Sequence, residues 1–323
     1  MTLRLFLVRH GETVDNVAGI YAGIRDSPLT AHGVLQARRL GAHLASRAAA
    51  IGPVRHVFAS DLRRAVETAA AVIDAQTAAV GDNQHCSQPT APDSDSGPLR
   101  VSGGANDYQA AELAMPLKLV ELPELRERDF GSAEGKKFGV DLALAGAESR
   151  EQMRQRAERF VDTHLASLLA AEQVASGGCI VVVSHGLILG SLLRVLLARY
   201  GGGQLAHLAD GKMPGWSNTG YYELVVAAAS TPSVAASSGL ASSGNSTEVS
   251  GERTPRLTLP TPPSQGPHIT LSVAGVNVLK HLEGLKKTRG GIGSAQFDKR
   301  QRTVDSFVPT AKKAKVEPAP EMA

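Results

Sequence analysis

Three short runs of hydrophobic residues along the chain each end in a polar motif. The runs are LFLV at 5–8, HVFA at 56–59 and CIVVV at 179–183, and they are followed by RHG, SDLRRA and SHG. Runs that are apolar throughout, without alternating polar residues, are typical of strands that are buried on both faces, as in parallel sheets. The pattern therefore predicts three strands of a mainly parallel sheet.

Helical patterns lie between these runs. Residues 33–49, 61–75 and 148–173 carry apolar positions at helical spacing, and Ser60 or Asp61 is placed to cap the second of these helices. Because strands and helices alternate, the sequence predicts an α/β fold. We expect a three-layer sandwich, in which helices flank both faces of a mainly parallel central sheet.

Two polar stretches interrupt this pattern. Both are rich in Ser, Pro, Gly and Thr and nearly free of large apolar residues, so they bury too little surface to offset the entropy lost on ordering. We therefore expect both to be disordered. The predicted organisation is a domain at 1–226 with a disordered insertion at about 81–107, a second insertion at 227–267, a segment closing the domain at 268–285, and a basic disordered tail at 286–323.

The charge is unevenly distributed along the chain. Residues 251–323 hold 12 Lys+Arg against 6 Asp+Glu, a net charge of +6, so that the overall +3 leaves −3 for residues 1–250. A nearly neutral body gives no reason to expect direct nucleic-acid binding, whereas a basic tail favours a transport signal or a protein partner. The chain has no run of about 18 apolar residues and no signal peptide pattern, so we expect a cytoplasmic and/or nuclear protein without membrane contact.

Polar side chains follow all three predicted strands. Ligands of an open parallel sheet bind at the carboxyl ends of its strands, so we expect Arg9, His10, His185 and either Arg64 or Arg63 to meet in one cleft. Arginines are suited to phosphate, and histidines can donate hydrogen bonds or attack. Taken singly, each side chain is better explained as structural or solvated. Together they predict a phosphoryl-transfer site that needs no metal and no other cofactor.

The two cysteines and the glycine of RHG have simpler explanations. Cys86 lies in a polar stretch and Cys179 opens a predicted strand, so neither a disulfide nor a metal site is expected. Gly11 is expected to let the backbone turn after the first strand.

Six segments, in this order, resemble the histidine phosphatase superfamily in its phosphoglycerate mutase-like branch. They are RHGETVDN (9–16), YAGIRDSPLTAHGVLQA (21–37), SDLRRAVETA (60–69), LRERDFGSAEG (125–135), GAES (146–149) and VVSHG (182–186). The segments WSNTGYYELVV (216–226) and VNVLKHLEGLKKTR (276–289) are similar to TIGAR-type fructose-2,6-bisphosphatases. Gly-Ala-Glu-Ser departs from the commoner Gly-Gly-Glu-Ser of the family.

The resemblance implies a role for each residue of the motifs. His10 would be the nucleophile that forms a phosphohistidine, and Glu127 would be the proton donor, although by itself Glu127 could belong to a surface ion-pair network. The spacing of SDLxRA selects Arg64 over Arg63. The residues that would hold the phosphoryl oxygens are Arg9, Arg64 and His185, with Asn16 and the backbone near Gly23 positioning the substrate.

The sequence thus predicts a metal-independent phosphatase acting on a small phosphorylated metabolite, with fructose 2,6-bisphosphate favoured by the resemblance. One alternative is a phosphoglycerate mutase-type phosphotransferase, which would use the same His10. Asp15 disfavours it, because glycolytic mutases usually have Trp there. The other alternative is a nuclear interaction protein that acts through its tail and keeps the fold as a scaffold.

The tail contains a possible partner motif. In KRQRTVDSFVPTAKKAK (299–315), Gln301, Val304 and Phe307 resemble the peptide by which replication and repair proteins bind the sliding clamp, although Val308 replaces the usual second aromatic residue. The flanking KRQR and KKAK have the spacing of a bipartite nuclear import signal. A solvated basic tail explains the same charges equally well.

Overall fold

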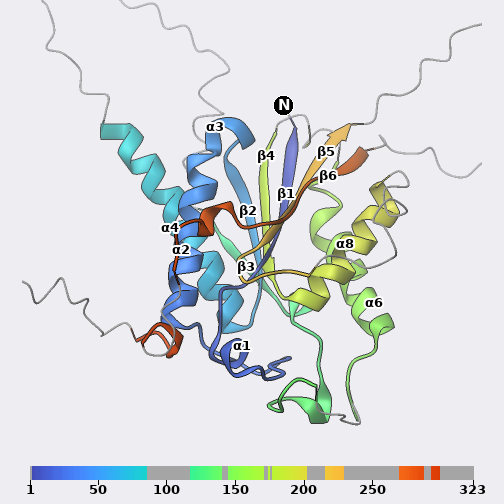
Figure 1. Ribbon diagram of the computed structural model, residues 1–323. Helices are drawn as coiled ribbons and strands as arrows, with labels where there is room; N and C mark the ends of the chain where they lie inside the picture. The colour runs from blue at the N-terminus through green and yellow to red at the C-terminus, as the bar shows by residue number, and fades with distance from the viewer. Residues whose placement is uncertain are drawn as a thin grey trace, which may run out of the picture.

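The computed structural model of the protein has a six-stranded sheet at its centre, with the strand order β3-β2-β4-β1-β5-β6 (Figure 1). The strands are β1 (Leu3–Arg9), β2 (Val54–Ser60), β3 (Leu119–Leu122), β4 (Gly178–Ser184), β5 (Tyr221–Ala228) and β6 (Ile269–Val278). Strands β1 to β4 pair in parallel, whereas β5 pairs antiparallel with both β1 and β6. The prediction of a mainly parallel sheet is confirmed. The antiparallel edge was not predicted, because an apolar run carries no sign of strand direction.

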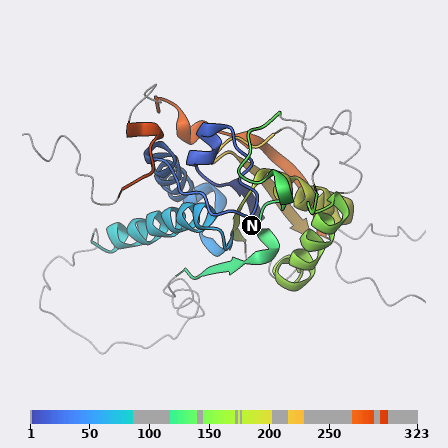
Figure 2. The same ribbon diagram turned by 90° about the horizontal axis from the view of Figure 1, so that it is seen from below.

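Helices cover both faces of the sheet, as Figures 1 and 2 show from two directions. The α-helices are α1 (Val14–Ala18), α2 (Ala31–Ser46), α3 (Ala48–Ile51), α4 (Arg63–His85), α6 (Arg150–Phe160) and α8 (Gly186–Tyr200). Short 3-10 turns lie at Pro123–Leu125, Gly131–Ala133, Lys280–Leu282 and Ile292–Ser294, and one π-helical turn lies at Val161–Leu165. Helices α2 and α4 pack on one face and α6 and α8 on the other, which gives the three predicted layers.

Strand β1 explains why the run from Leu5 to Val8 is apolar throughout. Leu5 and Leu7 belong to the hydrophobic core beneath α6 and α8, whereas Phe6 and Val8 belong to the core beneath α2 and α4. Successive side chains of a strand point to opposite faces, so a strand covered on both sides needs apolar residues at every position. The polar residues Arg9 and His10 begin where the two layers end.

The structure describes residues 2–85, 117–139, 145–170, 174, 177–201, 215–228, 269–286 and 292–298. Most of both expected insertions, the residue Cys86 and the tail motif at 299–315 lie outside these ranges. The expected insertion boundaries at 81 and 227 fall slightly inside ordered elements, because α4 continues to His85 and β5 continues to Ala228.

The chain returns to the domain after the second expected insertion. Strand β6 pairs along β5, within the segment that was expected to close the domain. Residues 292–298 also contact residues 29–31, where α2 begins. The amide of Ala31 donates to the carbonyl of Ala295 (3.1 Å), and the amide of Phe297 donates to the carbonyl of Leu29 (3.1 Å). The tail boundary expected at 286 is therefore too early for 292–298, because backbone hydrogen bonds of this kind have no signature in composition.

The start of α4 is tied to a neighbouring loop. The first helical amide, of Arg63, donates to the carboxylate of Asp26 (2.9 Å). Ser60 instead accepts from the amide of Leu62 (3.3 Å), and Asp61 forms an ion pair with Arg126. The capping predicted for Ser60 or Asp61 is therefore wrong for this amide, since the acceptor comes from a residue far away in sequence.

No helix in the described part of the chain is long and apolar enough to span a membrane.

Candidate active site

The carboxyl ends of β1 and β4 bring two histidine rings together. Arg9 pairs with Ser184 in the sheet, so that His10 and His185 follow at the ends of neighbouring strands. Their ring centroids are 5.0 Å apart, and the amide of His10 donates to the carbonyl of Ser184 (2.9 Å). The geometry thus brings the RHG and SHG motifs into one site, as expected for the edge of a parallel sheet.

One hydrogen bond fixes which nitrogen of His10 can react. Its Nδ1 lies 2.7 Å from the carbonyl oxygen of Gly11. Because a carbonyl can only accept, Nδ1 carries the proton of the neutral ring and Nε2 keeps its lone pair. Burial, followed by the charges of Arg64 and Arg9, lowers the pKa of His10 well below its usual value. His10 is therefore neutral near pH 7 and presents a free Nε2.

The ring of His185 has the opposite tautomer. Its Nδ1 accepts a hydrogen bond from Nε of Arg64 (3.2 Å), so the proton of the neutral ring lies on Nε2. Burial and the nearby Arg64 charge lower the pKa of His185 well below its usual value. Its Nε2 is buried and has no hydrogen-bond partner among the described residues. A buried donor without an acceptor is costly, and a phosphoryl oxygen would satisfy it.

Arg64 connects α4 to the loop above the cavity. Besides His185, its guanidinium donates to the carbonyls of Gly23 and Arg25 (2.7 Å each). Burial lowers the pKa of Arg64 to about 10, so it stays charged at neutral pH. Three of its five N–H groups are thus used by the protein, and two remain. Arg63, by contrast, is exposed and pairs with Glu67 at 2.8 Å, as expected when Arg64 is the site residue.

Arg9 supplies a second buried donor. Its Nη1 donates to the carbonyl of Trp216 (2.6 Å), which holds the guanidinium against the cavity. Its Nε is buried and has no partner among the described residues. Burial lowers the pKa of Arg9, and the charge of Glu127 opposes this change. The site therefore contains two unsatisfied donors, on Arg9 and His185, beside the free nitrogen of His10.

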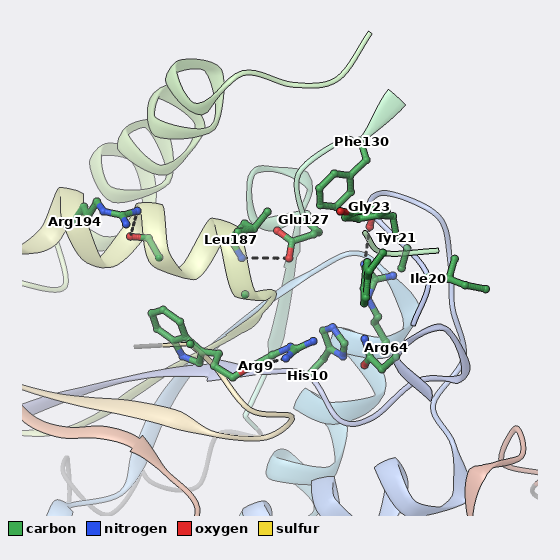
Figure 3. Close-up of a pocket in the computed structure, with 17 residues that line it drawn as sticks. Arg9, His10, Ile20, Tyr21, Gly23, Arg64, Glu127, Phe130, Leu187 and Arg194 are labelled. Carbon is green, nitrogen blue, oxygen red and sulfur yellow. Dashed lines mark hydrogen bonds between the residues drawn. The ribbon is translucent and has the colours of Figure 1, made fainter. Parts of the chain in front are cut away.

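Glu127 lies at the amino terminus of α8. Its carboxylate accepts from the amides of Leu187 (3.2 Å) and Ile188 (3.3 Å), and from that of Arg128 (2.9 Å). A helix amino terminus favours a negative group at this position. Arg156 holds the preceding backbone through the carbonyls of residues 124 and 126. Glu127 thus faces the same cavity as His10 (Figure 3). Its carboxylate accepts hydrogen bonds from backbone amides and, among the described residues, is not part of a surface ion-pair network, which was the alternative explanation.

Asn16 and Gly23 line the cavity as well. Gly23 has φ +54°, which favours glycine, and an added Cβ would lie 1.9 Å from a carboxylate oxygen of Glu134 and displace it. Asn16 accepts from the side-chain amide of Asn218 (3.0 Å), which also donates to the carbonyl of His10 (3.2 Å). Asn218 was missed as a site residue, because its segment was used only as a family marker.

Gly11 is required for a close approach and not for a left-handed turn. An added Cβ would lie 2.6 Å from the carbonyl oxygen of Gly33, and Gly11 is not among the residues with positive φ. The amide of Gly11 donates to the hydroxyl of Thr68 (3.0 Å), which in turn donates to the carbonyl of Arg64 (2.7 Å). Thr68 was also missed, although its position four residues after Arg64 on a helix was a usable signal.

These side chains surround a cavity of about 370 Å³. Figure 3 shows His10, Arg9 and Arg64 at its base, with Glu127 above them and Arg194 on the opposite side from Tyr21 and Ile20. The walls were not predicted, because apolar residues give the same pattern in a core and in a pocket. Several wall residues had no predicted role at the site, and the larger ones are Ile20, Tyr21, Phe130, Phe138, Leu187, Arg194 and Trp216.

The described residues contain no group of three or more His, Cys, Asp and Glu side chains that could hold a metal ion. Cys179 is a free, buried thiol, and burial raises its pKa to about 12. A thiol of this kind is inert.

Comparison with known proteins adds independent information. Residues 5–83 and 107–232 match the model of the histidine phosphatase superfamily, branch 1. A probable phosphatase of Schizosaccharomyces pombe is 27% identical over 311 residues, which are 93% of this chain and 78% of that protein. A probable phosphoglycerate mutase of Yersinia enterocolitica is 30% identical over 195 residues, or 60% of this chain and 75% of that protein. Among solved structures, mycobacterial hydrolase 1 has the same fold, with a TM-score of 0.51 and 19% identity over 85% of this chain and 98% of that one.

Proposed function

The chain belongs to the histidine phosphatase superfamily, branch 1, as a phosphoric monoester hydrolase, and from that premise we propose that it hydrolyses a small phosphorylated metabolite through a phosphohistidine at His10, without a metal ion. One observation carries the mechanism. The neutral ring of His10 keeps a free Nε2 beside two buried donors without partners, on Arg9 and His185. This is the arrangement that an entering phosphoryl group would complete.

In the first step, Nε2 of His10 attacks phosphorus and the bond to the leaving oxygen breaks. The three equatorial oxygens carry the developing charge, and Arg9, Arg64 and His185 supply donors to them. Glu127 gives a proton to the leaving oxygen. Hydrogen bonds from three backbone amides hold its carboxyl group in place for this transfer.

In the second step, water replaces the leaving group. Glu127, now a carboxylate, takes a proton from the water, and the hydroxide attacks phosphorus while the bond to Nε2 breaks. His10 returns to its neutral tautomer, still held by the carbonyl of Gly11. The products are inorganic phosphate and the alcohol.

Phosphate release by wild type and His10→Ala tests this mechanism. We expect release in the presence of EDTA that disappears in His10→Ala and persists in His32→Ala, since His32 does not line the cavity. Circular dichroism of the three proteins checks that all are folded. Persistent activity in His10→Ala, or its loss in EDTA, would contradict the mechanism.

Fructose 2,6-bisphosphate remains the favoured substrate within this proposal. Arg194 supports it, because its guanidinium lines the cavity away from His10 and its hydrogen bond to its own helix, to the carbonyl of Gly190, is long at 3.4 Å. Such a group is available for a second phosphate. We expect Arg194→Ala to raise KM about tenfold for the bisphosphate and to leave fructose 6-phosphate hydrolysis unchanged. Equal effects on both substrates would exclude this role.

A phosphoglycerate mutase-type transfer is the alternative, and the name of the Yersinia enterocolitica relative favours it. The two reactions share the phosphohistidine and differ in what accepts the phosphoryl group. Incubation with 3-phosphoglycerate distinguishes them: the hydrolase releases inorganic phosphate or leaves the ester unchanged, whereas the mutase accumulates 2-phosphoglycerate.

We propose in addition that the tail binds a sliding clamp and directs the protein to the nucleus. The support is the pattern of Gln301, Val304 and Phe307 between two basic clusters. A 299–315 peptide should bind the clamp more tightly than its Phe307→Ala version. If the two peptides bind equally, the motif has no such role, and the tail-mediated alternative loses its support.

A further inference from the structure

The loop at 216–220 holds the reactive end of β1. The amide of Thr219 donates to the carbonyls of Arg9 (3.0 Å) and His10 (3.2 Å). The side-chain amide of Asn218 donates to the same carbonyl of His10 (3.2 Å). The position of both reactive residues therefore depends on the conformation of this loop.

That conformation is strained at one residue. Thr219 is fully buried and has φ +56°, although it is β-branched. A β-branched residue in the left-handed region is strained and persists only where its surroundings hold it in place. The groups that hold Thr219 and its neighbours are therefore relevant to the site.

Asn277, near the end of β6, holds one side of the loop. Its Oδ1 accepts from the amide of Ser217 (2.9 Å), and its Nδ2 donates to the hydroxyl of Ser217 (3.1 Å). Gly220 makes room for this contact, since an added Cβ there would lie 2.3 Å from Oδ1 of Asn277. Two segments that are distant in sequence are thus fitted to each other.

His281, in the 3-10 turn that follows, holds the strained residue itself. The hydroxyl of Thr219 donates to the carbonyl of Asn218 (2.7 Å), so it accepts from Nε2 of His281 at 3.0 Å. Burial lowers the pKa of His281 to about 4, which keeps a single proton on the ring, and the contact places it on Nε2. The rings of His43 (5.8 Å) and Tyr221 (6.1 Å) flank it.

We propose that Asn277 and His281 are positioning residues for phosphoryl transfer at His10. Neither lines the cavity, and both act through the loop that fixes the backbone of Arg9 and His10. The carbonyl of Trp216 extends the effect to the guanidinium of Arg9. The inference rests on the proposed function, and it makes the segment after the 229–268 stretch part of the catalytic apparatus.

The test uses the full chain and four variants. Asn277→Gly removes both side-chain hydrogen bonds and keeps a backbone that accepts its φ of +44°. His281→Leu removes the donor to Thr219, and His281→Gln restores an N–H near the position of Nε2. Val276→Ala is the control, because Val276 lies on the same strand and is 44% exposed.

Two measurements separate positioning from folding. Calorimetric titration with inorganic phosphate gives the number of binding sites per chain, and so the fraction of folded sites. Hydrolysis of p-nitrophenyl phosphate gives kcat/KM per folded site. We expect Asn277→Gly and His281→Leu to keep close to one site per chain and to lower kcat/KM per site by about 10- to 100-fold, with His281→Gln and Val276→Ala within about threefold of wild type.

Three outcomes would overturn the proposal. A loss of sites with unchanged kcat/KM per site would show that the two residues only support folding. A His281→Gln variant as impaired as His281→Leu would show that the hydrogen bond to Thr219 is not what matters. If wild type releases no phosphate from any ester, the proposed function fails, and the affinity for inorganic phosphate then tests the positioning role. Unchanged affinity in Asn277→Gly and His281→Leu overturns that role. Affinity weakened in these two variants alone supports it.

Discussion

Replacing Thr68 by valine tests how the RHG turn is held. The hydroxyl of Thr68 is fully buried and accepts the amide of Gly11 at 3.0 Å. Valine has a similar shape but no acceptor, so Thr68→Val leaves that amide buried without a partner. Leaving a buried donor unsatisfied costs about 1–3 kcal/mol. We expect the free energy of unfolding to fall by that amount.

The same helix provides a matched control. Thr77 is exposed, and its hydroxyl donates only to the carbonyl of Ile73 (3.1 Å), four residues earlier on α4. Thr77→Val makes the same change in helix propensity, and water replaces the lost bond. We expect a change within about 0.5 kcal/mol.

Urea unfolding of the full chain, followed by circular dichroism, measures both variants against wild type at a common m-value. Thr68→Val should also lower kcat, because the carbonyl of Gly11 is the acceptor that orients His10. Thr77→Val should leave kcat unchanged. A Thr68→Val protein that loses no more stability than Thr77→Val would refute the argument that this amide depends on the hydroxyl.

Three further predictions concern the site. Glu127→Gln should lower kcat strongly for an alkyl phosphate and little for phosphoryl transfer from p-nitrophenyl phosphate, whose leaving group needs no proton; equal losses would argue against proton donation. Burial, assisted by Arg64, lowers the pKa of His10 and His185, so the unfolded chain binds more protons than the folded chain below pH 6.5. The free energy of unfolding from urea titrations should therefore fall as the pH drops from 7.5 to 5.5, and it should fall less in His10→Gln. A rise in this free energy would contradict the lowered pKa values. Gly23→Ala should lower kcat/KM far more than Gly146→Ala, because both have positive φ but only Gly23 would meet Glu134; similar effects would point to backbone strain alone.

The motifs in the sequence were sufficient to predict that most of the proposed site residues lie together. Arg9, His10 and His185 follow apolar runs, and parallel strands bring their carboxyl ends to one edge. The spacing of SDLxRA was enough to choose Arg64, and the structure shows it buried beside His185 while Arg63 is exposed. The first of these features depends on hydrophobic periodicity, and the choice of Arg64 depends on the resemblance of SDLRRA to the histidine phosphatase motif.

The tautomers and supports of the site could not be read from the sequence. The carbonyl of Gly11 and the guanidinium of Arg64 decide which nitrogens of His10 and His185 carry protons, and both contacts form only in the folded chain. Most of the wall residues are apolar, and apolar residues follow the same pattern whether they lie in a core or in a pocket. Only the tertiary structure shows whether such a residue lies in the core or in the pocket.

The sequence by itself determined the α/β layers, the motifs at the strand ends and the family, because hydrophobic periodicity and motif spacing are local properties. Tertiary structure alone decided the direction of β5, the contacts of Asn277 and His281 with the loop at 216–220, and the contacts of 292–298 with the body. The physical reason is that hydrogen bonds between residues distant in sequence depend on how the chain folds back. Composition and periodicity do not specify that path.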